Sequence, residues 1–127
     1  MLTPEQQETL TRVGAGTPAG ELLRRYWFPI AASVELRAAA ALPVRLLGED
    51  LALFRTGDGA LGLLDARCPH RGAPMDEGEV RDGCITCPWH GSIFRVDDGA
   101  LVQGPSTVAL PSYQCRVTTD AVEVRAR

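Results

Sequence analysis

Two short segments of the chain carry side chains that bind metals. The first holds Cys68 and His70, with one residue between them, and the second holds Cys87 and His90, with two. Sixteen residues separate the two pairs, which contain both of the chain's histidines. Thiolates and neutral imidazoles are ligands of zinc and of iron. The pattern therefore predicts a metal centre built from both segments.

Two kinds of centre use two cysteines and two histidines. A tetrahedral zinc ion is one, but paired zinc ligands are spaced more widely than Cys68 and His70. A cluster of two irons removes this constraint, because the Cys and His of one segment can bind different irons. Cys68 and Cys87 then hold one iron, and His70 and His90 hold the other. A zinc-stabilised binding module without a redox role remains the alternative.

The two segments resemble the ligand loops of the Rieske [2Fe–2S] domain. They read Cys68-Pro69-His70-Arg71-Gly72 and Cys87-Pro88-Trp89-His90-Gly91, and the loops are expected over residues 67–75 and 86–94. The resemblance implies one [2Fe–2S] cluster held by Cys68, His70, Cys87 and His90. It also implies that Gly104-Pro105 belongs to a third loop that shields the cluster, and that the hydroxyl of Ser92 bonds to cluster sulfur.

Other segments of the chain also resemble Rieske proteins, and differences from high-potential members indicate the redox potential. Residues 16–27 and 44–50 are similar to the N-terminal part of phthalate-type Rieske oxygenases, whereas the second half resembles a stand-alone Rieske ferredoxin. High-potential Rieske proteins have a second hydroxyl, from a tyrosine, and a disulfide between the loops. Here Phe94 replaces the tyrosine, and Ala73 and Trp89 replace the cysteines. We therefore expect a potential in the lower half of the range of about −150 to +300 mV.

The remaining sequence predicts an all-β fold with a short helical start. Thr3 begins a capping box completed by Gln6, and a second helix is expected from Thr17 to Trp27, ended by Pro29. Eight short apolar runs separated by turns follow, which is typical of a small antiparallel barrel or sandwich with a cluster-binding subdomain. They are Ile30–Ser33, Val44–Leu47, Leu51–Phe54, Leu61–Leu64, Ile93–Val96, Ala100–Val102, Tyr113–Thr118 and Ala121–Val124.

Turns and domain limits follow from the same pattern. Turns are expected at Gly48-Glu49-Asp50, Gly57-Asp58-Gly59, Asp97-Asp98-Gly99 and Thr119-Asp120, where Gly and Asp adopt positive φ easily. A short hairpin is expected between the two ligand loops, and Ala38–Ala41 as a helical turn or linker. We divide the chain into a helical segment, 1–28, and a Rieske domain, 29–127.

Composition excludes several classes of protein. The 127 residues suit one domain, and 45% apolar and 23% charged residues are typical of a globular protein. A net charge of −3 gives no basic excess for nucleic acid, and no apolar run approaches the roughly 20 residues of a membrane-spanning helix. The start has no features of a secretory signal, so we expect a cytoplasmic protein.

Several other residues have more than one interpretation. Cys84 and Cys115 are expected to be small buried apolar residues, with a spare ligand or a redox thiol as the alternatives for Cys84. A disulfide between the two stays open. Asp76, Glu77 and Glu79 form either a solvated acidic hairpin or a docking patch for a basic partner. Trp89 is expected to be a packing residue rather than an electron relay.

These observations favour an electron carrier. The leading hypothesis is a ferredoxin that passes single electrons from a flavin-dependent NAD(P)H reductase to a separate Rieske oxygenase. The alternative is a Rieske subunit, or a shortened Rieske part, of an oxygenase or of a nitrite-reductase-like complex. A Rieske oxygenase activates oxygen at an iron with two His ligands and one carboxylate, and both histidines here are assigned to the cluster. We therefore expect no catalysis by this chain alone.

Overall fold

Two short helices form the start of the molecule. The computed structural model describes residues 1–32, 40–117 and 121–125. Helix α1 spans Pro4–Thr11 and helix α2 spans Pro18–Leu23. The capping box is confirmed, because Thr3 Oγ1 accepts from Gln6 N at 3.1 Å and Gln6 Oε1 accepts from Thr3 N at 2.9 Å. Neither described helix is long and apolar enough to cross a membrane.

Helix α2 is shorter than the sequence predicts. It ends at Leu23, and the extension to Trp27 is wrong. Arg25 N and Tyr26 N bond to the carbonyls three residues earlier, which closes the helix in a tight turn. Pro29 does not end a helix but lies within the first strand, whose pairing with the last strand outweighs the local helical pattern.

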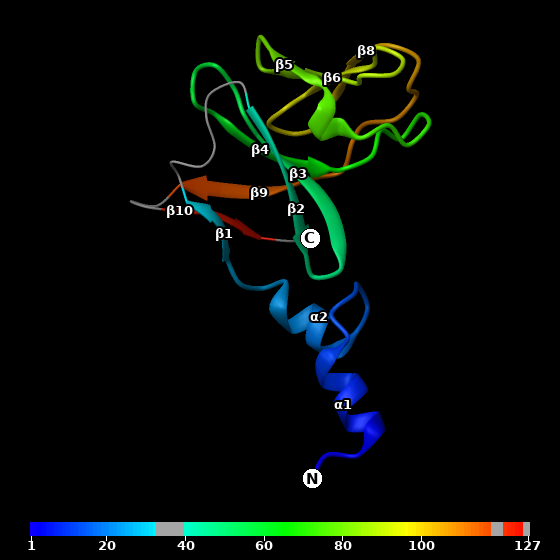
Figure 1. Ribbon diagram of the computed structural model, residues 1–127, viewed down its shortest axis with the longest axis vertical. Helices are drawn as coiled ribbons and strands as arrows, with labels where there is room; N and C mark the ends of the chain where they lie inside the picture. The colour runs from blue at the N-terminus through cyan, green and yellow to red at the C-terminus, as the bar shows by residue number, and fades with distance from the viewer. Residues whose placement is uncertain (33–39, 118–120, 126–127) are drawn as a thin grey trace.

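Six antiparallel strands form the larger sheet. They are β1 (Phe28–Ala32), β2 (Ala40–Leu46), β3 (Glu49–Arg55), β4 (Leu61–Asp65), β9 (Ser112–Val117) and β10 (Ala121–Arg125). Their order is β1-β10-β9-β4-β3-β2, and the sheet curls into a nearly closed barrel (Figure 1). The expected all-β fold is confirmed.

Four short strands form a second sheet around the expected ligand loops. They are β5 (Glu79–Arg81), β6 (Cys84–Thr86), β7 (Ile93–Arg95) and β8 (Leu101–Gln103), in the order β5-β6-β7-β8. The expected hairpin between the loops is β5–β6. Its turn residues, Asp82 and Gly83, have φ of 53° and 76°, typical of a two-residue hairpin. This sheet and the helices lie at opposite ends of the molecule (Figure 1).

Strand β3 joins the two halves of the interior. Leu51 and Leu53 point into the barrel, where they pack with β4 and β10. Ala52 and Phe54 point to the opposite face, where they pack with residues of β6 and β7. Because successive side chains of a strand alternate between faces, burial on both sides requires the continuous apolar run of β3. The small sheet is thereby fixed on the outside of the barrel.

Three local predictions need correction. The β2–β3 turn is Leu47–Gly48, with both φ values positive, one residue earlier than expected. Ala40 and Ala41 belong to β2 rather than to a helical turn or linker, because they pair with Arg55 and Phe54 of β3. The acidic segment lies only partly in a hairpin. Glu79 is on β5 of the β5–β6 hairpin, whereas Asp76 and Glu77 lie in a 3-10 turn, η2 (Met75–Glu77).

Some predicted elements lie partly outside the described residues. These are the strand ends at Ser33 and Thr118, the Ala38 and Ala39 part of the alanine run, and the turn Thr119-Asp120.

Candidate metal centre

The first ligand loop follows β4 and is closed by backbone hydrogen bonds. Cys68 N donates to Ala73 O at 2.8 Å, and Gly72 N donates to Cys68 O at 2.7 Å. A bridge between Arg67 and Pro74 closes the base of the loop. Gly72 has a φ of 79°, a conformation that glycine adopts without strain. Cys68 is therefore fixed in the interior, with 2% of its surface exposed.

The second ligand loop, between β6 and β7, repeats this pattern. Cys87 N donates to Ser92 O at 2.7 Å, and Gly91 N donates to Cys87 O at 3.2 Å. Gly91 has the same φ as Gly72, 79°. Cys87 is also 2% exposed. The Cys-Pro and Gly residues common to both segments thus form the same local structure twice.

The two loops bring the four predicted ligands together in two pairs. The rings of His70 and His90 lie with their centroids 4.9 Å apart and their planes perpendicular. Burial raises the pKa of the Cys68 thiol, and the nearby Cys87 thiol raises this pKa further. A metal cation reverses both effects, because it stabilises thiolates. The adjacent thiols therefore suit a metal centre better than a metal-free interior.

The pairing fits two irons better than a single ion. Nδ1 of His70 is buried and has no hydrogen-bond partner, so it is available as a ligand atom. Within the described part of the chain, no three His, Cys, Asp or Glu side chains converge on one point as ligands of a single ion. One thiol pair and one imidazole pair fit a cluster in which Cys68 and Cys87 hold one iron while His70 and His90 hold the other.

A third loop, between β8 and β9, packs on the second ligand loop. Ser92 and Ser106 are both buried, and Ser106 N donates to Ser92 Oγ at 3.1 Å. Gly104 has a φ of 121°, and a Cβ there would collide with Ser92 Cα. Pro105 is exposed beside it. Sequence reasoning selected Ser92, Gly104 and Pro105 but missed Ser106, whose contact spans 14 residues and leaves no local signal.

Three other candidate residues are Cys84, Cys115 and Trp89. All four cysteines are free, so the disulfide between Cys84 and Cys115 is absent. Both are half-buried, and burial raises the pKa of the Cys115 thiol to about 12, which makes it unreactive. The expectation for Trp89 is wrong: its side chain is 59% exposed, between Pro88 and His90 of the second ligand loop.

Comparisons with known proteins agree with this geometry. The family model of the Rieske [2Fe–2S] domain matches residues 26–114. The chain is 44% identical to the 5,5'-dehydrodivanillate O-demethylase oxygenase subunit of Sphingobium sp., over 99% of this chain and 30% of that protein. It is 36% identical to the phthalate 4,5-dioxygenase oxygenase subunit of Pseudomonas putida, over 98% of this chain and 29% of that protein.

A solved structure supports the same assignment. A chain from the complex of reduced oxygenase and oxidized ferredoxin in carbazole 1,9a-dioxygenase superposes with a TM-score of 0.71 at 29% identity. The match covers 78% of this chain and 92% of that chain. The chain therefore belongs to the Rieske [2Fe–2S] family, and its Rieske domain binds a [2Fe–2S] cluster. It spans less than a third of the length of the two oxygenase subunits.

Proposed function

We propose that the chain is the Rieske electron-transfer part of an oxygenase-type system, with its cluster held by Cys68, Cys87, His70 and His90. In this role it takes single electrons from a reductase or ferredoxin and passes them to an oxygen-activating iron. The observation that carries the proposal is the meeting of the two ligand loops, with both imidazoles adjacent and both thiols buried. The matches to oxygenase subunits cover 98–99% of this chain, which favours this role over that of a free ferredoxin.

The surroundings of each ligand indicate its contribution. A bound Rieske cluster supplies one-electron redox chemistry, at about −150 to +300 mV. Neutral imidazoles at His70 and His90 carry less negative charge than thiolates, which favours the reduced state relative to an all-cysteine site. His90 is exposed and His70 is half-buried, so a partner protein meets the edge of His90 first. Cys68 and Cys87 are 2% exposed, which excludes water from the thiolate side.

A free carrier, the ferredoxin role, is the second candidate. It is supported by the chain in the carbazole dioxygenase complex, 92% of which is covered by a match to this protein. A carrier requires a flavin-dependent NAD(P)H reductase as its electron source and a separate oxygenase as its acceptor. The two roles differ in partners and not in cluster chemistry. We infer a cytoplasmic compartment, because Cys84 and Cys115, the two cysteines not assigned to the cluster, are free thiols.

The experiment that tests the proposal is visible absorption and low-temperature EPR of the purified protein, before and after dithionite. We expect a red-brown protein whose reduced form has the low average g of a mixed His and Cys cluster. A colourless protein that retains stoichiometric zinc after anaerobic reconstitution would overturn the proposal.

A second measurement separates the two roles. The dithionite-reduced protein is mixed with the oxidised oxygenase component of a phthalate-type system, and cluster reoxidation is followed by absorption. A free carrier reduces that oxygenase with rates that saturate with its concentration. A part of an oxygenase transfers electrons within its own assembly, so we expect slow reoxidation without saturation.

A further inference from the structure

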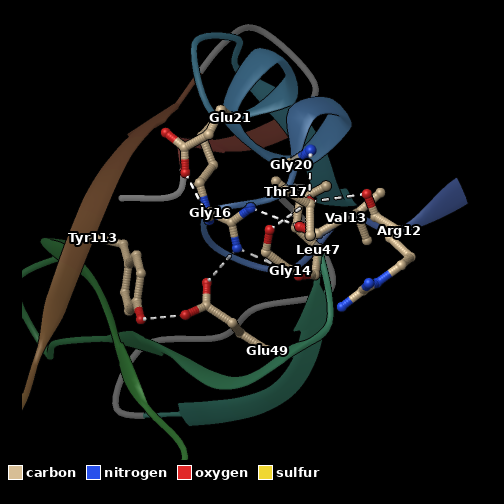
Figure 2. A network of polar contacts seen from close by, with 11 residues as sticks. Arg12, Val13, Gly14, Gly16, Thr17, Gly20, Glu21, Leu47, Glu49 and Tyr113 are labelled. Atoms are coloured by element: carbon tan, nitrogen blue, oxygen red, sulfur yellow. Dashed lines mark hydrogen bonds and ion pairs between the residues drawn. The ribbon is translucent and has the colours of Figure 1, made fainter. Parts of the chain in front are cut away.

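Four polar or charged side chains are buried in the part of the chain that the structure describes. They are Arg24, Thr56, Ser92 and Ser106. Burial of a polar group costs free energy unless the group is hydrogen-bonded, so each of the four needs partners. Arg24 donates through both terminal nitrogens of its guanidinium, to Val13 O at 2.6 Å and to Glu49 Oε2 at 3.3 Å, and only its Nε has no partner (Figure 2).

The hydroxyl of Ser92 differs from the other buried hydroxyls. Thr56 Oγ1 donates to Asp58 Oδ1, and Ser106 Oγ donates to Val108 O at 2.8 Å. Ser92 Oγ accepts from Ser106 N at 3.1 Å, but no atom of the described residues accepts its own hydrogen. Bulk water does not reach Ser92, which is 0% exposed. This hydrogen therefore needs an acceptor that the described polypeptide does not supply.

The proposed metal centre lies beside this hydroxyl. Ser92 ends the second ligand loop, and its carbonyl accepts from the backbone N–H of Cys87, a proposed ligand, at 2.7 Å. The sulfides and thiolates of a bound [2Fe–2S] cluster carry negative charge and accept hydrogen bonds. A cluster sulfur is therefore the acceptor that suits the Ser92 hydroxyl.

The backbone N–H of Ser106 restricts the direction of this hydroxyl. A serine hydroxyl rotates about its Cβ–Oγ bond and has one hydrogen and two lone pairs. Because Ser106 N–H points at a lone pair of Ser92 Oγ, the hydroxyl hydrogen is turned away from the third loop. Ser106 is itself held in place, since its Oγ both donates to Val108 O and accepts from Val108 N at 3.3 Å.

Close contact between the second and third loops keeps this donor in position. Strands β7 and β8 pair at Ile93 and Gln103. The residues next to this pair, Ser92 and Gly104, are in such close contact that a Cβ on Gly104 would collide with Ser92 Cα. The glycine thus allows the third loop to reach the Ser92 side chain.

We propose that the backbone N–H of Ser106 is a positioning group that turns the Ser92 hydroxyl towards a cluster sulfur and thereby raises the redox potential. This inference rests on the proposed function, because it requires the bound cluster. A hydrogen bond to sulfur favours the reduced cluster, which carries one more negative charge than the oxidised cluster. The third loop therefore influences electron transfer through a single hydrogen bond, in addition to covering the second ligand loop.

The test removes the N–H of Ser106 and measures the potential by redox titration. Ser106→Pro removes it, and so does a protein in which an ester replaces the peptide bond before Ser106. We expect the affinity of the cluster for its electron to fall by about threefold, which is about 30 mV at 59 mV per tenfold change. Ser92→Ala removes the hydroxyl itself and should lower this affinity by about fivefold.

Ser106→Ala is the matched control, because it retains the N–H. We expect no more than half of the shift seen in the ester protein. If Ser106→Pro does not fold, the ester protein gives the measurement, since it retains the Ser106 side chain and its bonds to Val108. An unchanged potential in the ester protein or in Ser92→Ala, with the cluster intact, would overturn the inference.

A double substitution separates positioning from loop support. If the N–H acts through Ser92, its removal in the Ser92→Ala protein leaves the potential at the value of Ser92→Ala alone. A purely structural role would lower the melting temperature in both backgrounds without this dependence of the potential on Ser92. Equal shifts of the potential in the two backgrounds would contradict the proposal.

Pulsed EPR of the reduced protein in H2O and D2O reports the hydroxyl directly. We expect an exchangeable proton coupled to the cluster that is lost in Ser92→Ala and more weakly coupled in the ester protein. The same proton signal in all three proteins would refute the positioning. The iron content and absorption of the wild type report the proposed function separately. A wild type without a cluster refutes that function, whereas an intact cluster that is insensitive to the Ser106 N–H refutes only the positioning.

Discussion

The two ligand loops have the same backbone structure but different support. In both, the cysteine N–H bonds to the carbonyl five residues later, and a glycine with φ of 79° returns the chain to the cysteine carbonyl. The first loop is closed by contacts within its own segment, which are the bridge between Arg67 and Pro74 and the bond from Arg67 Nη1 to Gly72 O at 3.4 Å. The second is also covered by the third loop, through Ser92 and Ser106. The repeat therefore sets the ligand geometry, while the surroundings set how firmly each loop is held.

The largest effects are expected from the cysteines of the two loops. Cys68→Ala and Cys87→Ala should each abolish the cluster, because each removes one of two thiolates from the same iron. Loss of cluster binding also removes the stability that the metal adds to both loops. Visible absorption and iron content of the purified variants measure this, and the two losses should be equal.

Cys84→Ala is the matched control for this pair. Cys84 is half-buried on β6, three residues before Cys87, and its thiol is free. We expect full iron content and an unchanged spectrum. Loss of iron in this variant, equal to that in Cys87→Ala, would refute the ligand assignment.

Glycine substitutions test whether the support of the loops differs. Gly104→Ala combines an unfavourable φ of 121° with a collision against the Ser92 backbone, and we expect a loss of about 3 kcal/mol. Gly72→Ala and Gly91→Ala meet no atom within 4 Å and cost only the positive φ, about 1 kcal/mol each. Melting temperatures of the holo proteins rank the three, with about 4 °C expected per kcal/mol. If Gly72→Ala were the most harmful, the first loop would be the more constrained one.

Ser92→Ala tests the link between the second and third loops. The substitution leaves the buried N–H of Ser106 without an acceptor, at a cost of about 1–3 kcal/mol. Cluster release in denaturant should be faster than in the wild type. Ser106→Ala retains that N–H and is the matched control, so a smaller effect is expected. Equal effects of the two variants would show that the hydrogen bond between the loops is unimportant.

Local signals predicted much of the fold and singled out the residues of the proposed site. The proposed ligands and the hairpin turns depend on residue types within a few positions, such as Cys-Pro in the loops and Gly57-Asp58-Gly59 in a turn, where Gly59 has a positive φ. What the sequence did not reveal depends on distant contacts. Arg24 meets Glu49 across 25 positions, and Glu49 meets Tyr113 across 64. The error for Trp89 has the same origin, because only the folded chain shows that Pro88, Trp89 and His90 are exposed.

The smallest expected effect is a shift of the redox potential by a substitution on β7, the strand that follows the second ligand loop. Phe94 is fully buried on β7, where high-potential Rieske proteins are expected to have a tyrosine hydroxyl. In Phe94→Tyr a new hydrogen bond to cluster sulfur, of about 1 kcal/mol, stabilises the reduced state and raises the potential by about 40 mV. Redox titration followed by absorption measures the change from a wild-type value that we expect in the lower half of the Rieske range. An unchanged potential with an intact cluster would mean that position 94 does not face the sulfur, and that the low potential has another cause.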